Sequence, residues 1–150
     1  MDKISLISDL KLSKLEQIKD ERGAVFHFLK ATDDTFKGFG EAYYSKINPN
    51  VIKGWKLHNK FHQHFCVPTG SVKVVIFDNR EKSLSKGMIN EIILDDEKNF
   101  YLLSMPPGLW YSFKCISDYP SLLANIINYP HDKSESINMP IYNDEIPFKW

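Results

Sequence analysis

The residues with the clearest chemical potential cluster before the middle of the chain, where three of the five histidines lie close together. If residues 54–58 form a strand, Lys56 and His58 point to one face of it. A histidine that titrates near neutrality can remove a proton from carbon, and a desolvated lysine can act as a base or stabilise an oxyanion. Tyr111 or His64 could then return the proton. These residue types predict proton transfer at a carbon next to a ketone, unless the polar face is an ordinary solvated one.

The histidine cluster also admits a metal site. His62 and His64 form an H-x-H pair that resembles the first half of the metal-binding motif of cupins, and His58 lies just upstream. Three histidines are chemically adequate for zinc or iron. The glutamate of that motif is missing, however, and Tyr111 stands where its later histidine would be. We therefore expect no metal, and keep a metal-dependent cupin enzyme using these three histidines as an alternative.

Strands must position these residues, and the rest of the sequence is mostly of strand type. Residues 71–78 are β-branched and bounded by turn residues, which predicts the strongest strand. Residues 24–29 follow a turn at 20–23 and alternate between two largely apolar faces, which predicts a strand buried on both sides. Short strands separated by turns predict an all-β, antiparallel sandwich or barrel that forms one domain, 1–150. Further strands are expected at 90–94, 100–105, 110–116 and 121–128, and an irregular extended tail from Pro130.

Composition excludes several classes of protein. Lysine and arginine together number 19, as do aspartate and glutamate, so the net charge is zero and a nucleic-acid-binding protein is not expected. No apolar run approaches the roughly 20 residues that span a membrane. Cys66 and Cys115 lie in apolar stretches without metal-binding spacing, which predicts two buried reduced thiols. The chain is therefore expected to be cytoplasmic.

Five segments, in order, resemble motifs of the dTDP-4-dehydrorhamnose 3,5-epimerase family. The D-E-R-G turn before an aromatic strand and the N-V-I-K-G-W segment look like the family's D-E-R-G and N-V-L-R-G-L. The strand with its D-N-R ending, the P-P-G turn and the C-terminal Y-N-D…W also have counterparts. No single match is specific, but the order of all five is. They occupy residues 20–23, 50–55, 70–80, 106–108 and 142–150.

The resemblance implies a cupin-like jelly roll, a homodimer and no cofactor. It also implies a nucleotide-diphosphate 4-keto-6-deoxy sugar as substrate, in deoxysugar or surface polysaccharide biosynthesis. By the same resemblance, Arg22 and Lys53 hold the diphosphate. Further candidates for substrate contacts are Glu41, Gln63 and Asn125.

The sequence departs from the family at the catalytic positions. The family's base histidine falls on Lys56, and its catalytic lysine falls on Gln63. The histidine after the P-x-G turn falls on Tyr111, and the acid tyrosine falls near Ala124, with Asn125 beside it. The leading hypothesis is an epimerase or ketoisomerase with a rearranged site. A non-catalytic protein that binds a sugar or a partner through a degenerate site is the alternative.

Overall fold

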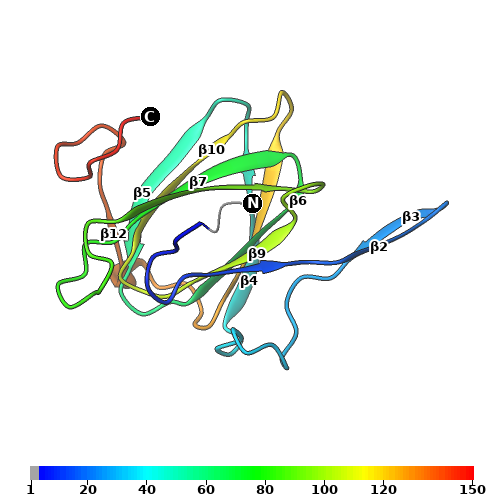
Figure 1. Cartoon of the computed structure of the whole chain (residues 1–150), viewed down its shortest axis with the longest axis horizontal. Helices are drawn as coiled ribbons and strands as arrows, with labels where there is room; N and C mark the ends of the chain where they lie inside the picture. The colour runs from blue at the N-terminus through cyan, green and yellow to red at the C-terminus, as the bar shows by residue number, and fades with distance from the viewer. Residues whose placement is uncertain (1–3) are drawn as a thin grey trace.

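The computed structural model describes residues 4–150 and consists of two antiparallel five-stranded sheets that pack face to face, plus a separate hairpin (Figure 1). The first sheet has the strand order β1-β9-β6-β11-β4, and the second has the order β12-β5-β10-β7-β8. The hairpin consists of β2 and β3. The predicted all-β, antiparallel sandwich is confirmed. Within residues 4–150, no helix is long and apolar enough to cross a lipid bilayer.

The strands are short, each three to seven residues long. In the first sheet they are β1 (Lys11–Lys14), β4 (Glu41–Ile47), β6 (Gln63–Thr69), β9 (Tyr101–Met105) and β11 (Ser121–Ile127). In the second sheet they are β5 (Ile52–His58), β7 (Ser71–Phe77), β8 (Ile89–Asp95), β10 (Trp110–Cys115) and β12 (Ser136–Asn138). The hairpin strands are β2 (Gln17–Asp20) and β3 (Gly23–Phe26), and one 3-10 turn, η1 (Lys133–Glu135), precedes β12.

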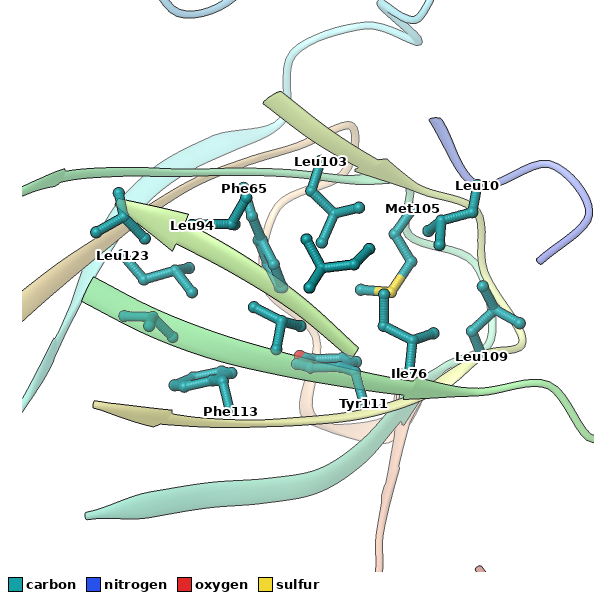
Figure 2. Close-up of a cluster of buried hydrophobic side chains, with 14 of the residues drawn as sticks. Leu10, Phe65, Ile76, Leu94, Leu103, Met105, Leu109, Tyr111, Phe113 and Leu123 are labelled. Atoms are coloured by element: carbon teal, nitrogen blue, oxygen red, sulfur yellow. The ribbon is translucent and has the colours of Figure 1, made fainter. Parts of the chain in front are cut away.

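The hydrophobic core fills the space between the two sheets (Figure 2). Because side chains alternate across a strand, the β-branched sequence of β7 places Val72, Val74 and Ile76 in this core, where each is fully buried. Phe65 of β6 and Leu103 of β9 close the core from the first sheet. Tyr111 and Phe113 of β10 also enter this core, so a phenolic hydroxyl lies among apolar side chains.

The β2–β3 hairpin does not match the burial predicted for residues 24–29. It extends away from the sandwich, and all four residues of β3 are exposed (Figure 1). The side chains of Ile18 and Val25, which face each other across the hairpin, are 57% and 58% exposed. The sequence does alternate as predicted, but among the described residues of one chain no second layer covers the side chains of Ile18 and Val25.

Glycine allows one unusually close approach near the site. Gly54 in β5 has a φ of +117°, and a Cβ there would lie 2.7 Å from the Cβ of Ser112 and 2.8 Å from the carbonyl oxygen of Tyr111. The pairing of β5 with β10 shifts register at this point, between Tyr111 and Ser112. A larger residue would push the two strands apart. The glycine thus keeps Lys56 and Tyr111, which are paired across these strands, in a fixed relation.

Candidate active site

A cavity of about 340 Å³ lies between the two sheets. Both sheets contribute to its lining, and the polar residues come from the four strands β4, β5, β10 and β12. A cavity of this size, with apolar walls and a few polar groups, is typical of a small-molecule site. The lining residues are Tyr43, Ser45, Lys53, Gly54, Lys56, Phe65, Tyr111, Phe113, Leu123 and Asn138.

Behind the Tyr111 wall of the cavity, three buried polar side chains are linked in a row. The Glu135 carboxylate, from η1, accepts a hydrogen bond of 2.7 Å from Nδ1 of His58, at the end of β5. The Nε2 atom of His58 lies 3.1 Å from the hydroxyl oxygen of Tyr111. His58 and Glu135 are each 5% exposed, and neither lines the cavity. Tyr111 is the member of the row that reaches it.

The second carboxylate oxygen of Glu135 is also fully used. It accepts hydrogen bonds from the backbone N–H groups of Lys60 (2.8 Å) and Phe61 (3.1 Å). Burial acts to raise the pKa of Glu135, but the hydrogen bonds from His58 and from these two N–H groups outweigh it, so the net pKa lies below the usual value. Glu135 is therefore an ionised acceptor, and the proton between it and His58 is held on Nδ1.

His58 is a neutral imidazole near pH 7. Burial lowers its pKa, and the contact with Glu135 only partly offsets this effect. Since Nδ1 carries the proton, the lone pair of Nε2 faces Tyr111 and accepts the phenolic proton. Burial also raises the pKa of Tyr111. In this row a proton can pass from Tyr111 to His58, and the resulting imidazolium would be stabilised by Glu135.

On the first sheet, a buried amide network faces the same cavity. Asn125 of β11 donates through Nδ2 to the hydroxyl oxygen of Tyr43 (2.9 Å) and to Oε1 of Gln63 (3.0 Å). Its own Oδ1 accepts from the backbone N–H of His64 (3.0 Å). The side chain of Gln63 also acts on Tyr111, where it lowers the pKa of the phenol in opposition to burial. Asn125 and Gln63 are buried behind the lining, and Tyr43 is the member of this network that lines the cavity.

Two lysines give the cavity a positive wall. Lys53 and Lys56 both lie on β5 and line the cavity on either side of Gly54 and Trp55. The ammonium group of Lys53 donates to the hydroxyl of Ser45 (3.1 Å) and to the backbone carbonyl of Lys46 (2.8 Å). No carboxylate pairs with Lys53 or Lys56 in the part of the chain that the structure describes. Their charges remain available to an anionic ligand.

Besides His58, Gln63 and Asn125, three further candidate residues do not line the cavity. Arg22 is at the tip of the β2–β3 hairpin, where it pairs with Asp20 at 2.6 Å in solvent. Glu41, at the start of β4, accepts from the backbone N–H of His131 (2.8 Å) and does not line the cavity. His64 does not reach the cavity either, because its side chain projects from the opposite face of β6 to Gln63 and Phe65.

The position of His64 also corrects the metal-site alternative. Its Nδ1 and Nε2 atoms lie 3.0 and 2.9 Å from the backbone carbonyl oxygens of Ile126 and Thr35. His58 belongs to the other sheet and uses its two nitrogens for Glu135 and Tyr111. Across residues 4–150, no three histidine, cysteine, aspartate or glutamate side chains converge. A centre built from His58, His62 and His64 is therefore excluded by their placement.

Sequence reasoning missed Glu135 and assigned no chemical role to Tyr43. Glu135 lies in a polar loop, 77 positions from His58, and nothing in the local pattern distinguishes it from a solvated glutamate. Tyr43 lies in β4, which was not predicted as a strand. A weak signal was available there, since the two-residue period of a strand puts Tyr43, Ser45 and Ile47 on one face. That alternation was hard to read because its inward face is largely polar.

Comparison with known proteins finds a matching family and relatives named for glycan and polysaccharide biosynthesis. Residues 5–150 match the model of the family described as dTDP-4-dehydrorhamnose 3,5-epimerase. A probable low-salt glycan biosynthesis epimerase of Haloferax volcanii is 33% identical over 126 residues, covering 83% of this chain and 78% of the relative. A spore coat polysaccharide biosynthesis protein of Bacillus subtilis is 29% identical over 147 residues, 97% of both chains.

A solved structure has nearly the same fold as this chain. The crystal structure of a dTDP sugar isomerase from Desulfovibrio desulfuricans G20 superimposes with a TM-score of 0.93 at 40% sequence identity. The match covers 96% of this chain and 92% of that one. The two folds thus agree over nearly their whole length.

Proposed function

The chain belongs to the dTDP-4-dehydrorhamnose 3,5-epimerase family, an isomerase family, and we propose that it transfers a proton at the carbon next to the ketone of a nucleotide-diphosphate keto-sugar. The observation that carries this mechanism is the row Glu135–His58–Tyr111, which ends at the cavity. The names of the relatives support a role in the biosynthesis of a surface polysaccharide or glycan.

The row removes the substrate proton in one concerted step. The Tyr111 oxygen takes the proton from carbon while its own proton moves to Nε2 of His58, and the electron pair of the C–H bond forms the enolate. Burial raises the pKa of Tyr111, so a free phenolate would be a costly base. Passing the proton on to His58 avoids that state, because the positive charge then forms beside the Glu135 carboxylate.

The two lysines have different tasks in this proposal. Lys56 is paired with Tyr111 across β5 and β10, which supports a role in stabilising the enolate oxygen next to the carbon that loses its proton. Lys53 lies three residues earlier on the same strand, next to Ser45, and binds the diphosphate. Both charges lack a carboxylate partner within the described residues, which supports an anionic substrate.

The ordered site argues for an enzyme rather than a binding-only descendant. A protein that only held a sugar would gain little from a buried carboxylate–histidine pair that does not line the cavity. Burying both groups costs free energy, and keeping them paired preserves a proton acceptor rather than a surface for contact. Cys66 and Cys115 are buried free thiols, which supports a cytoplasmic location.

We also propose that the protein forms a homodimer through the β2–β3 hairpin. A two-stranded hairpin is marginally stable on its own, and the β2–β3 hairpin exposes the apolar side chains of Ile18 and Val25. A second copy of the chain covers them. Arg22, at the tip of the hairpin, then contributes its charge to the substrate of that second copy. Replacing Ile18 and Val25 together by glutamate should convert the dimer to a monomer in sedimentation measurements.

The test of the reaction is deuterium exchange. The protein is incubated in heavy water with dTDP-4-keto-6-deoxyglucose, and the sugar carbons are followed by NMR and mass spectrometry. Exchange at a carbon next to the ketone is expected in the native protein and should be lost in the variant His58→Ala. Nucleotide binding without exchange at any carbon would refute proton transfer.

A further inference from the structure

The hydrogen bonds around the cavity form two series, and the direction of each can be assigned from one of its ends. In the first series, the ionised Glu135 can only accept, so Nδ1 of His58 donates to it. The lone pair of Nε2 then accepts, so the hydroxyl of Tyr111 donates its proton to His58 at 3.1 Å. The hydroxyl proton of Tyr111 is therefore donated to His58, which belongs to the second sheet and lies on the side away from the cavity.

In the second series, which contains Asn125, a backbone N–H fixes the direction. The N–H of His64 can only donate, so the atom of Asn125 that lies 3.0 Å from it is the amide oxygen. The Asn125 nitrogen must then point the other way, and it donates to Tyr43 and to Gln63. Gln63 accepts through its side-chain oxygen. No link in either series has two donors or two acceptors facing each other.

In the second series, the hydroxyl of Tyr43 donates its proton to no acceptor within residues 4–150. The hydroxyl oxygen of Tyr43 accepts from Asn125 at 2.9 Å, and within residues 4–150 this is its one hydrogen bond. Its own O–H is therefore free, and Tyr43 lines the cavity. The N–H of Asn125 would also stabilise the phenolate that remains after the proton leaves, in opposition to burial, which raises the pKa of Tyr43.

Tyr43 and Tyr111 stand on opposite sides of the cavity. Tyr43 belongs to β4 in the first sheet, and Tyr111 belongs to β10 in the second. A sugar bound between the sheets would present one face of its ring to each tyrosine. Proton removal by one and proton delivery by the other would change the configuration of the carbon between them.

We propose that Tyr43 is the catalytic acid that delivers a proton to the enolate on the face opposite to Tyr111, so that the enzyme inverts one carbon centre. The inference rests on the proposed function. In this step the O–H bond of Tyr43 breaks and a new C–H bond forms. Tyr43 is left as a phenolate held by Asn125, and His58 is left as an imidazolium held by Glu135. Proton exchange with water returns both to their starting states.

The structure also supplies a reason for Asn125 at this place. An aspartate would fit the same space, but its oxygens could not donate to both Tyr43 and Gln63. Asn125 is thus a positioning residue, and the role of Tyr43 depends on the direction in which this amide points.

The test separates proton removal from inversion in the variant Tyr43→Phe. The substitution deletes one hydroxyl and with it an acceptor of Asn125, so thermal melting together with thymidine diphosphate binding checks that fold and cavity persist. With dTDP-4-keto-6-deoxyglucose in heavy water, we expect deuterium exchange at the reacting carbon to stay within about tenfold of the native rate. Formation of the inverted product should fall by about 10²-fold or more. Tyr44→Phe is the matched control, since Tyr44 is the neighbouring exposed tyrosine and does not line the cavity.

Each other outcome overturns a different statement. Equal loss of exchange and product in Tyr43→Phe would make Tyr43 part of proton removal and refute its role as the opposite donor. Native rates of both would exclude it from catalysis. Absence of exchange and product in the native protein would refute the proposed function itself, and the role of Tyr43 with it.

Discussion

Replacing Glu135 by glutamine should reverse the direction of the proton row while leaving its shape nearly unchanged. One oxygen of Glu135 faces Nδ1 of His58, and the other accepts two backbone N–H groups. Glutamine has one oxygen for these two places. If that oxygen faced His58, the amide nitrogen would stand against the N–H groups of Lys60 and Phe61, leaving two buried donors without an acceptor.

The magnitude follows from those contacts. A buried donor without a partner costs about 1–3 kcal/mol, so the arrangement with two such donors is disfavoured by roughly 2 kcal/mol or more. In the variant Glu135→Gln, the amide oxygen therefore takes the place facing the two N–H groups, and the amide nitrogen donates to Nδ1 of His58. His58 must then carry its proton on Nε2, which can no longer accept the proton of Tyr111. The exchange rate should fall by roughly 10²–10⁴.

Two measurements check this reasoning. Nitrogen NMR of ring-labelled histidine should report the Nδ1–H tautomer of His58 in the native protein and the Nε2–H tautomer in E135Q. Deuterium exchange into the keto-sugar should be lost in E135Q with the affinity for nucleotide unchanged. Glu81→Gln, at an exposed glutamate paired with Lys86, is the control. An E135Q variant that shows the changed tautomer but exchanges deuterium within about threefold of the native rate would refute the relay.

Three further predictions concern the same site. Because burial lowers the pKa of His58 below 6.5 and its neutral form accepts the proton, the exchange rate should be constant above pH 6.5 and fall only below it; a midpoint above pH 7 would contradict this. Lys53→Ala should raise KM for the nucleotide sugar by about tenfold with kcat little changed, measured by steady-state kinetics. His64→Leu should lower the free energy of unfolding in urea by about 1–3 kcal/mol, since a backbone carbonyl beside the ring loses its donor, while kcat stays within about twofold.

The sequence predicted five strands well, because their patterns are governed by the apolar core. They are β7, β8 and β10 of the second sheet and β9 and β11 of the first. The short strand β12, by contrast, lies in the tail that was expected to be irregular. The strand expected at 71–78 is β7 (Ser71–Phe77), and the one expected at 110–116 is β10 (Trp110–Cys115). The strands β4 and β6 were not predicted. The inward face of β4 is polar where it lines the cavity, and β6 is buried on both faces, so neither shows a simple alternation of apolar and polar residues.

The site was harder to predict because residues that interact in it lie far apart along the chain. The two-residue period of a strand placed Lys56 and His58 on one face, and the structure agrees, since Lys56 lines the cavity and His58 contacts Tyr111 behind it. The partner of His58 is 77 positions away, and that of Asn125 at Tyr43 is 82 positions away. No local pattern encodes such pairs, because they arise only when the sheets assemble.

The departures from the family pattern take on a different meaning in this arrangement. Separately, Gln63, Tyr111 and Asn125 each look like the loss of a catalytic residue. In the structure, all three take part in buried hydrogen bonds. Tyr111 belongs to the row with His58 and Glu135, and Gln63 and Asn125 belong to the network that ends at Tyr43. Independent decay would leave buried amides and hydroxyls without partners, each at a cost of about 1–3 kcal/mol. Here both amides and the Tyr111 hydroxyl are buried and paired. The exchanged residues therefore form a rearranged apparatus for moving protons.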